Sequence, residues 1–436
     1  MITERYSVPH FLQFETTYGC NSHCVFCYNP SRERHYSDEL TWKIVRAIAA
    51  AEVPLVQLTG GEVSMLANLN DYADHLGERS KVSIVTNGIR RRDLSESIVK
   101  IFLSLHGDKE THERVTANPG TYDTIVETIS HYVGRGFRVA ADVLLCADNY
   151  TQMYDIVRKA AELGMVEVYI NRFQGGGFGA AIINKMMPPI DMFREALGQL
   201  IAARDDFGIP VVFGTTIPLC VDERLVLEGF EFNCHMGVKF GAVAPDGEMR
   251  ACNQALKGYG NITKTPLEEI WQSAALDDYR DHRWVTGICT ECPLLDRCGG
   301  GCRVDNSQTA DYCPDSFVRD MDKRPDVVER ILAREAERGP AAPVPVSPQT
   351  GRRRLKTEDG LSIIRKHPEK YLARRSYSVL VVDDVCADLC AAASDGVDEP
   401  ALWDACRRRN GNLDDALLGR YVDHLVAAGV MCASKN

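Results

Sequence analysis

Residues 18–29 read Tyr-Gly-Cys-Asn-Ser-His-Cys-Val-Phe-Cys-Tyr-Asn and contain three cysteines, Cys20, Cys24 and Cys27, in the spacing C-x3-C-x2-C. A structural zinc site normally takes four ligands, whereas an iron-sulfur cluster held by three protein thiolates keeps one iron open for a substrate or cofactor. The spacing therefore favours a cluster. A zinc site with His23 as its fourth ligand is the alternative, although a histidine inside so tight a loop more often points elsewhere.

The composition is that of an ordinary globular protein, with 436 residues, 45% hydrophobic and 25% charged. At roughly 150 residues per domain, this length allows about three domains. No apolar run approaches the roughly 20 residues of a membrane-spanning helix, and the N-terminus has no apolar stretch of signal-peptide length. The net charge of −11 disfavours a protein that gathers nucleic-acid phosphates over its whole surface. We therefore expect a cytoplasmic protein that binds neither membrane nor nucleic acid.

Cysteine is the unusual component, with sixteen residues in the chain. In a reducing compartment, this number argues against a disulfide framework and for metal or redox chemistry. One group lies near the N-terminus and a larger one lies between residues 220 and 313. The remaining cysteines lie outside both groups.

Short β-prone runs alternate with stretches of helical spacing between residue 11 and about residue 172. The β-prone runs cover residues 11–17, 55–58, 82–85, 101–105, 139–145 and 166–170, and helical stretches include residues 38–51, 122–133 and 151–163. This alternation predicts an α/β fold with a parallel sheet and helices outside it. Six strands fit a partial (β/α)6 barrel. A doubly wound sheet has the same periodicity and is the alternative.

After a predicted helix over residues 192–207, the chain becomes irregular and rich in glycine and cysteine as far as residue 314. Such a region buries too little apolar surface to offset chain entropy, and metal commonly holds it. Prolines at positions 340, 343, 345 and 348 predict a stiff linker. We expect a barrel over residues 1–210, a cysteine-rich domain over 211–335, a linker over 336–351 and a small α+β domain over 352–436.

The N-terminal cysteine spacing, with the aromatic Phe26 before Cys27, resembles the signature of the radical S-adenosylmethionine (SAM) family. Gly60, Gly61 and Glu62 follow the second β-prone run and are similar to the family's GGE motif, where backbone groups meet the methionine amine. Parallel folds bind ligands at the carboxyl ends of their strands, which is where this motif falls.

Two more segments follow β-prone runs, Thr86-Asn87-Gly88 and Ser104-Leu105-His106-Gly107. The second resembles the family's SxDG segment, with His106 in place of the aspartate. The resemblance covers most of residues 10–175. It implies that the SAM contacts are Phe26, Gly60, Gly61, Glu62, Asn87 and Ser104.

The resemblance also implies a reaction. A [4Fe-4S] cluster on Cys20, Cys24 and Cys27 would bind SAM, pass it an electron from an external one-electron reductant and release a 5′-deoxyadenosyl radical. The radical would take a hydrogen atom from the substrate. The protein would exclude water and hold the target C–H beside the radical, because a loose pocket would allow abstraction from the wrong atom.

The second cysteine group has the spacing C-x12-G-x4-C, then C-x2-C-x5-C-x3-C, then a last cysteine. This resembles the seven-cysteine SPASM pattern, here Cys234, Cys252, Cys289, Cys292, Cys298, Cys302 and Cys313. Zinc ribbons also use C-x2-C pairs but would leave three or four thiols over.

An eighth, upstream ligand is common in the SPASM family, and Cys220 is the candidate. Eight thiolates suit two [4Fe-4S] clusters, which gives three clusters in the chain. The family's interleaved order implies Cys220, Cys234, Cys252 and Cys302 on the first auxiliary cluster, and Cys289, Cys292, Cys298 and Cys313 on the second. If Cys220 is only a buried thiol, the first auxiliary cluster has an open iron. Such clusters relay or accept electrons, or hold the region folded.

Two residues bear on the type of reaction. Asn253 stands where sulfatase maturases of this family carry an aspartate, which argues against formylglycine formation. Cys146, near the end of the fifth β-prone run, is a candidate hydrogen donor to a substrate radical, as an epimerase requires. A buried free cysteine is usually inert. The sequence assigns no other catalytic residue.

The C-terminal module begins with a basic stretch, with nine Lys or Arg against three acids between Arg352 and Arg375. A β-prone run over residues 377–382 and helical patterns over 384–393, 401–408 and 413–428 follow. This order resembles the winged-helix-like recognition element for ribosomally made, modified peptides that is found in pyrroloquinoline quinone biosynthesis. Such a domain binds a leader peptide by strand addition, with charge steering the encounter. A solvated basic surface is the alternative.

Together these features predict a radical SAM/SPASM enzyme that modifies a precursor peptide carrying a leader. Thioether formation, crosslinking, oxidation and epimerisation begin with the same abstraction, so the type of reaction stays open. One alternative is a SPASM enzyme acting on a small molecule or protein side chain. A second is a non-catalytic iron-sulfur binding or electron-transfer protein. Cleavage of SAM by the reduced protein would distinguish an enzyme from this second alternative.

Overall fold

The computed structural model describes two parts of the chain. Residues 6–29, 31–176, 181–230, 233–281, 285–304, 315–319, 321 and 325–338 are described in the first, and residues 353–357, 362–367, 370–375, 378–382, 397–398 and 431–435 in the second. Contacts divide the chain into two compact units, Met1–Arg338 and Gly339–Asn436.

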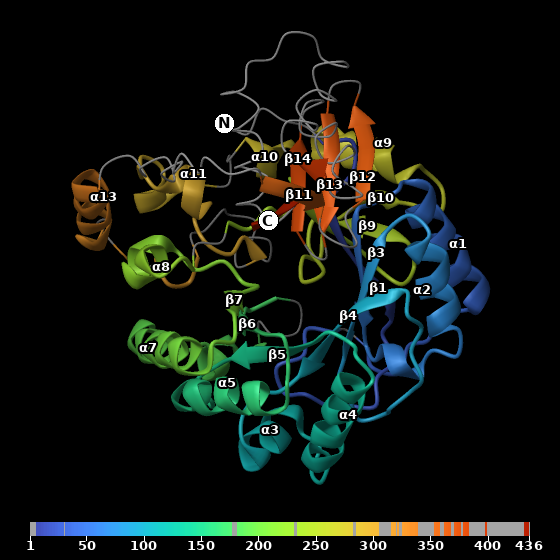
Figure 1. Ribbon diagram of the computed structural model, residues 1–436, viewed down its shortest axis with the longest axis horizontal. Coiled ribbons are helices and arrows are strands. Elements are labelled where there is room, and N and C mark those ends of the chain that lie inside the picture. Colours follow the sequence, from blue (N-terminus) through green and yellow to red (C-terminus); the bar gives the residue numbers. More distant parts are fainter. Residues whose placement is uncertain are drawn as a thin grey trace. The chain divides into compact units, whose positions relative to one another are not determined.

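Seven parallel strands alternate with helices in the first unit (Figure 1). The strands are β1 (Phe11–Thr17), β2 (Leu55–Gly60), β3 (Lys81–Thr86), β4 (Ile98–Ser104), β5 (Val139–Leu145), β6 (Glu167–Arg172) and β7 (Val211–Phe213). The helices are α1 (Asp38–Ala50), α2 (Leu69–Gly77), α3 (Lys109–Thr116), α4 (Tyr122–Gly134), α5 (Met153–Glu162), α6 (Ile183–Met186) and α7 (Ile190–Phe207). The six predicted strands are present as β1 to β6, and β7 extends the sheet past the predicted boundary at residue 210.

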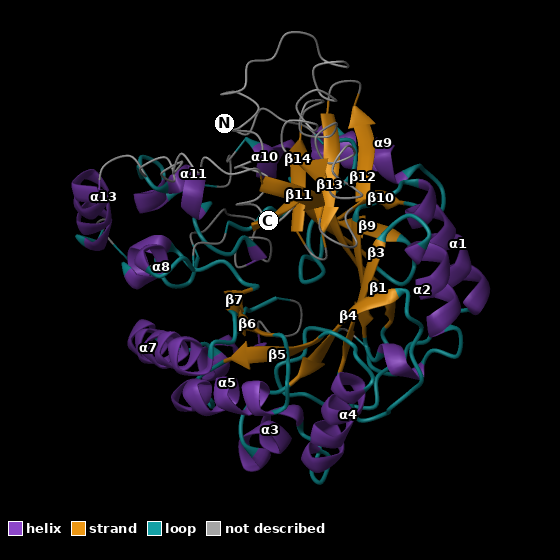
Figure 2. Cartoon of the chain, in the orientation of Figure 1, coloured by secondary structure: helices purple, strands orange, loops and turns teal. Residues whose placement is uncertain are grey.

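The strand order decides between the two predicted architectures. Strands β1 to β7 lie in the sheet in the order in which they occur in the chain, each parallel to the next. A doubly wound sheet reverses its order at a switch point, and this sheet does not. Figure 2 shows the strands on an open curve with the helices outside it. The predicted α/β fold with a partial barrel is confirmed.

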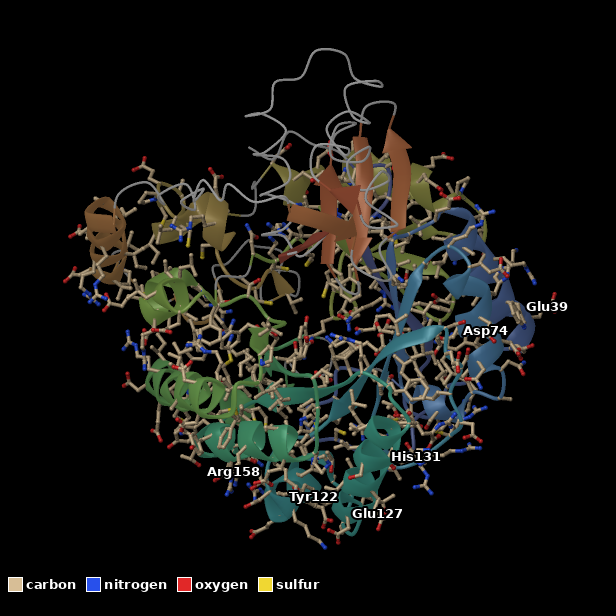
Figure 3. All side chains as sticks on the ribbon, viewed as in Figure 1. Glu39, Asp74, Tyr122, Glu127, His131 and Arg158 are labelled. Carbon is tan, nitrogen blue, oxygen red and sulfur yellow. The ribbon has the colours of Figure 1, made fainter. Side chains whose placement is uncertain are left out.

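The helices cover the sheet with one apolar face. In α4, Ile125, Ile129 and Tyr132 are buried, whereas Glu127 is exposed and points outward with His131 (Figure 3). Because buried residues recur at helical spacing, the same pattern that predicted these helices also orients them. A surface cleft is lined by the residues just before α3 and by residues of α4 and α5, including Tyr122 and Arg158, and no cysteine lines it. Figure 3 labels Tyr122 and Arg158 on this helical side.

The cysteine-rich region adds strands to the same sheet. Strand β8 (Phe240–Val243) pairs in parallel with β1, and β9 (Glu248–Arg250) and β10 (Gly258–Asn261) continue the sheet in antiparallel fashion. The short helices of this region are α8 (Arg224–Leu227), α9 (Leu267–Gln272), α10 (Asp277–Arg280) and α11 (Leu295–Cys298), and α13 (Val327–Arg338) closes the unit. The region is therefore less irregular than its sequence indicates. Helix α13 also runs into the segment predicted as a linker.

The second unit contains two antiparallel three-stranded sheets. Strands β12 (Ser362–His367), β13 (Lys370–Arg375) and β14 (Ser378–Val382) form a meander. Strands β15 (Val397–Asp398), β11 (Arg353–Thr357) and β16 (Met431–Lys435) form the other sheet. The predicted β-prone run corresponds to β14. The three predicted helices and residues 339–351 of the predicted linker lie outside the described residues.

Within the described residues, no helix combines the length and the apolar character needed to cross a membrane.

Candidate active site and cluster-binding loops

The loop after β1 closes on itself and gathers Cys20, Cys24 and Cys27. The Cys20 N–H donates to the Arg32 carbonyl at 2.9 Å, and the Arg32 guanidinium donates to the Cys24 carbonyl at 2.6 Å. The Val25 N–H donates to the Val115 carbonyl in α3 at 3.0 Å. These bonds fix an irregular loop at the carboxyl end of the sheet, where parallel folds bind ligands.

The three thiols are close enough to interact electrostatically. Burial is the main cause that raises the pKa of Cys20 to about 12 and that of Cys24 to about 11, and charge on the neighbouring cysteines raises both further. The Ser22 hydroxyl lies 3.0 Å from Cys24 Sγ. Without iron these two thiols keep their protons at neutral pH. Because iron binds thiolates, cluster binding here releases protons.

The donor set of the loop consists of three thiols. A [4Fe-4S] cluster held by three protein thiolates keeps one iron open. The His23 side chain is exposed to solvent. Three gathered thiols therefore fit a cluster with one open iron.

Strand β2 ends at Gly60, and the backbone of Gly60 and Gly61 packs against the start of the cysteine loop. A β-carbon at Gly60 would lie 2.3 Å from the Thr17 carbonyl oxygen, and one at Gly61 would lie 2.0 Å from the Gly19 oxygen. The Gly61 N–H donates to the Thr17 carbonyl at 2.6 Å, and the Glu62 N–H donates to the Gly19 carbonyl at 2.8 Å. Gly60 also has a φ of +128°. Only glycine permits this approach.

The carboxylate of Glu62 joins the ends of β2 and β3. It is buried and accepts hydrogen bonds from the Ser64 N–H at 2.9 Å, the Thr86 hydroxyl at 2.5 Å and the Asn87 N–H at 2.8 Å. The Asn87 amide in turn donates to Asn21 Oδ1 inside the cysteine loop at 2.8 Å. Both carboxylate oxygens of Glu62 already accept hydrogen bonds within the protein. The groups of this motif that would contact SAM are therefore those of its backbone.

His106 takes a structural role where the family's aspartate was expected. Its Nδ1 accepts from the Leu144 N–H at 3.1 Å, and its backbone N–H donates to His112 Nδ1 at 3.2 Å. Burial lowers the pKa of His106 well below its ordinary value, so the ring is neutral. The Phe26 ring meets it edge-on at 5.1 Å, and Ser104 ends the adjacent β4. The segment thus borders the cysteine loop through the neutral ring of His106.

Cys146 is completely buried at the end of β5. It packs with Phe173 and Met186, and Phe26 lies partly buried against this cluster. Burial is the main cause that raises the pKa of its thiol to about 11. The hydrogen-donor role stays a prediction, and it would require this side chain to become accessible to the substrate.

A buried carboxylate network that sequence reasoning missed joins the two cysteine regions. Glu15 on β1 is 1% exposed and pairs with Arg250, which also donates to the Tyr18 hydroxyl at 2.8 Å. Tyr28 hydrogen-bonds Glu15 and accepts from the Asn253 amide at 2.7 Å. Glu15 interrupts a largely buried strand, which is the signal available in the sequence. Its partners cannot be found by spacing, because Arg250 is 235 residues away.

The network predicts a pH effect. Burial is the main cause that raises the Glu15 pKa from 4.5 to about 7, although Arg250, Tyr28 and Tyr18 lower it. Between these values the folded state holds a proton that the unfolded state has lost, so stability falls as pH rises through this window. We expect Glu15→Gln to flatten that fall.

Anaerobic urea denaturation between about pH 5 and pH 8 measures this slope for wild type and Glu15→Gln. Replacing exposed Glu39 on α1 (Figure 3) by glutamine is the control and should leave the wild-type slope unchanged. Equal slopes in Glu15→Gln and wild type would contradict the raised pKa.

The second cysteine region is built on a sharp turn. Gly299, Gly300 and Gly301, between Cys298 and Cys302, have φ values of +64°, +77° and +90°, a conformation that favours glycine. A β-carbon at Gly301 would lie 2.6 Å from the β-carbon of Asp315. The three glycines therefore allow the chain between Cys298 and Cys302 to form a tight turn, with both cysteines buried.

The described SPASM thiols fall into two electrostatic neighbourhoods. Cys252 interacts with Cys234, and the buried guanidinium of Arg303 interacts with Cys234 and Cys302. Cys220 interacts most strongly with a different set, Cys298, Cys289 and Cys292. The expected grouping of Cys220 with Cys234, Cys252 and Cys302 on one cluster stays a prediction. Cys313 lies outside the described residues.

A buried ion pair joins Arg172 on β6 to Asp315, which in turn contacts the backbone of Cys302. The side chains of Arg172 and Asp315 are both 0% exposed and contact each other. Asp315 also accepts from the Cys302 N–H at 2.7 Å and the Phe317 N–H at 2.9 Å. This carboxylate thus positions Cys302 relative to the barrel.

Comparison with protein families agrees with both cysteine regions. Residues 14–170 match the radical SAM superfamily, and residues 234–293 match the SPASM iron-sulfur cluster-binding domain. The first match spans β1 to β6 with the Cys20 loop and the Glu62 motif. The second begins at Cys234 and includes Cys252, Cys289 and Cys292.

Three known proteins illustrate the range of similar chains. The antilisterial bacteriocin subtilosin biosynthesis protein AlbA of Bacillus subtilis is 24% identical over 321 residues, which cover 68% of this chain and 68% of AlbA. Fe-coproporphyrin III synthase of Methanosarcina barkeri is 22% identical over 345 residues, 68% of this chain and 86% of that protein. Streptococcus suis SuiB bound to its precursor peptide SuiA superimposes with a TM-score of 0.59 at 17% identity, covering 72% of this chain and 76% of SuiB. The structural likeness shows the fold.

Proposed function

This protein is a radical SAM enzyme with a SPASM iron-sulfur domain, and we propose that it modifies a ribosomally made precursor peptide. The observation that carries the proposal is the separate C-terminal unit, whose β12–β13–β14 meander offers a peptide the edges of an antiparallel sheet. Main-chain strand addition at such an edge is a common mode of peptide recognition. AlbA and SuiB support the same substrate class, since one is named for bacteriocin biosynthesis and the other binds a precursor peptide.

The chain's own residues would prepare the radical reaction. When bound, the cluster of the first loop supplies the electron that cleaves SAM to a 5′-deoxyadenosyl radical. Gly60 and Gly61 hold the end of β2 against that loop, and Glu62 fixes the end of β3 beside it. Phe26 and the neutral His106 pack against each other and give one side of the cysteine loop an apolar, uncharged surface. Such a rigid, water-poor setting restricts the radical to one C–H bond.

The partners and compartment follow from this chemistry. We propose a leader-bearing peptide and an external one-electron reductant as partners, and the cytoplasm as the compartment, because its reducing conditions keep thiols available to iron. Domain boundaries near residues 210 and 338 and a leader-binding role for residues 352–436 belong to the same proposal. Relatives named for a biosynthetic step, such as AlbA and Fe-coproporphyrin III synthase, support an enzyme over the non-catalytic alternative.

The alternative function is modification of a small molecule, and a specific observation favours it. Fe-coproporphyrin III synthase, named for a porphyrin product, matches as much of this chain as AlbA does. The two functions differ in their need for the C-terminal unit. A peptide modifier would use it to capture a leader, whereas an enzyme acting on a small molecule would not.

The test is capture of a short peptide encoded beside the gene by the full-length, cluster-loaded protein. We expect binding by fluorescence anisotropy and a mass change in the peptide on incubation with SAM and reductant. Replacing Arg374 and Arg375 of β13 by glutamate should slow association, more at low salt than at high, if the leader is acidic. SAM cleavage without peptide should be unchanged.

The matched control reverses two charges elsewhere, with Lys43→Glu and Arg46→Glu at exposed positions on α1. It changes the net charge equally, so it separates local docking from the overall charge. Absence of both peptide binding and a mass change, with SAM cleavage intact, would contradict the peptide function and favour the small-molecule alternative.

A further inference from the structure

A row of partly exposed residues crosses the inner face of the barrel at its later strands. Register pairing places them side by side, with one residue from each of β4 to β7, namely Ser104, Asp142, Tyr169 and Val212. All four keep some exposure to solvent, whereas the residues before and after each of them in the chain are buried. Because side chains alternate between the two faces of a sheet and the helices lie outside the curve (Figure 2), the row faces inward.

The two central side chains of this row, Asp142 and Tyr169, are held in place by their neighbours. The Asn171 amide donates to Asp142 Oδ1 at 2.8 Å. The Phe102 ring meets the Tyr169 ring edge-on, with 5.4 Å between the ring centroids. Gly214 leaves room for both neighbours, because a β-carbon there would lie 2.1 Å from Tyr169 Cε1 and 2.5 Å from Asn171 Oδ1. Asp142 and Tyr169 are therefore positioned before a ligand binds.

Each of these two side chains keeps a polar group for a further partner. Within the residues that the structure describes, Asp142 Oδ2 and the Tyr169 hydroxyl make no hydrogen bond. A carboxylate oxygen only accepts hydrogen bonds, whereas a phenol hydroxyl can donate one. A carboxylate partly removed from water with a single donor is poorly compensated, so a ligand with an N–H or O–H would stabilise it. The pair thus offers one acceptor and one donor side by side.

We propose that Asp142 and Tyr169 bind one peptide group of the substrate, in which the N–H donates to Asp142 and the carbonyl accepts from the Tyr169 hydroxyl. This role rests on the proposed peptide function and names the residues that would hold the peptide inside the barrel. Asp142 pairs in register with Ser104, the predicted SAM contact, so the bound peptide group would lie next to SAM. Val212, which is 37% exposed, would extend the row as an apolar contact for the peptide.

Asp142→Asn and Tyr169→Phe test the two contacts in the full-length, cluster-loaded protein, with the short peptide encoded beside the gene as substrate. Both changes keep the size of the side chain, and asparagine can still accept from Asn171. A hydrogen bond to a charged group contributes more than one between neutral groups. We expect the rate of peptide modification to fall about tenfold or more in Asp142→Asn and about two- to tenfold in Tyr169→Phe. More 5′-deoxyadenosine should form per modified peptide, because the radical is no longer held at its target.

SAM binding, SAM cleavage without peptide and leader binding by anisotropy should be unchanged in both variants. The matched controls are Asp155→Asn on α5 and Tyr122→Phe on α4, which make the same chemical changes on the helical side and should keep the wild-type ratio of 5′-deoxyadenosine to modified peptide. That ratio in Asp142→Asn and Tyr169→Phe would overturn the assignment if it equalled the wild-type one.

Weaker SAM binding or slower cleavage without peptide in Asp142→Asn would overturn the assignment as well, and would place this carboxylate against the SAM ribose. If the wild-type protein itself leaves the peptide unmodified, the proposed peptide function fails, and the peptide contact fails with it. A wild-type protein that modifies the peptide, with both variants unaffected, would remove only the contact.

Discussion

Replacing Cys20, Cys24 and Cys27 together by alanine is expected to abolish 5′-deoxyadenosine formation completely. It should also remove about four of about twelve irons from the reconstituted protein. The loop that holds these thiols closes by backbone contacts with Arg32 and Val115, which alanine leaves in place. The loss should therefore be one of iron and chemistry rather than of fold.

Anaerobic iron analysis and chromatography of the SAM products measure both effects. Cys146→Ala is the matched control, because it removes a buried thiol from the same unit that is not one of the three cysteines of the loop. It should keep the full iron content. Unchanged SAM cleavage in the triple variant would show that the radical chemistry does not depend on this loop.

The largest expected effect on stability comes from the buried ion pair of Arg172 and Asp315. Removing one partner of such a pair leaves a buried charge without compensation and costs about 3–5 kcal/mol. Asp315→Ala would also remove the acceptor of the Cys302 N–H. We expect the free energy of unfolding to fall by this amount and the auxiliary cluster that includes Cys302 to be lost first.

Denaturant unfolding under anaerobic conditions, followed by circular dichroism and cluster absorbance, gives both quantities. The double variant Arg172→Met/Asp315→Leu should be more stable than Asp315→Ala, because no charge is then stranded. The matched control is Asp155→Ala, which breaks a pair with Arg158 whose side chains are 64% and 49% exposed (Figure 3). That pair should contribute at most about 1 kcal/mol. Equal losses at Asp315 and Asp155 would contradict a special role for the buried pair.

Most of the barrel could be predicted from the sequence because each of its strands and helices has a pattern within its own short segment. Strands β1 and β5 have the bounds that their alternation predicts, and α1 begins at Asp38 as predicted because Ser37 caps it. The Cys20 loop and the Gly60–Glu62 motif were recognised because their residues are close in the chain. In each case the pattern and the structure that it forms occupy the same short segment.

What the sequence did not predict depends on contacts between distant segments. The pairing of Glu15 with Arg250 and of Arg172 with Asp315 has no spacing that could identify it. Strand β8 contains four residues in a glycine-rich region and is stabilised by pairing with β1 rather than by its own pattern. The surroundings of Cys220 likewise depend on a contact between distant segments, because the neighbouring Leu219 N–H donates to Cys298 Sγ, 79 residues away.

The pairing of β8 with β1 has a consequence for synthesis of the chain. Phe11 pairs with Phe240, so one edge of β1 stays without its partner until the ribosome has made more than half of the protein. Contacts between such distant residues fold slowly, and an unpaired strand edge invites association with other chains. We expect a nascent chain ending before residue 240 to depend on chaperones and to aggregate when they are limiting. The SPASM region would thus complete the barrel as well as bind iron.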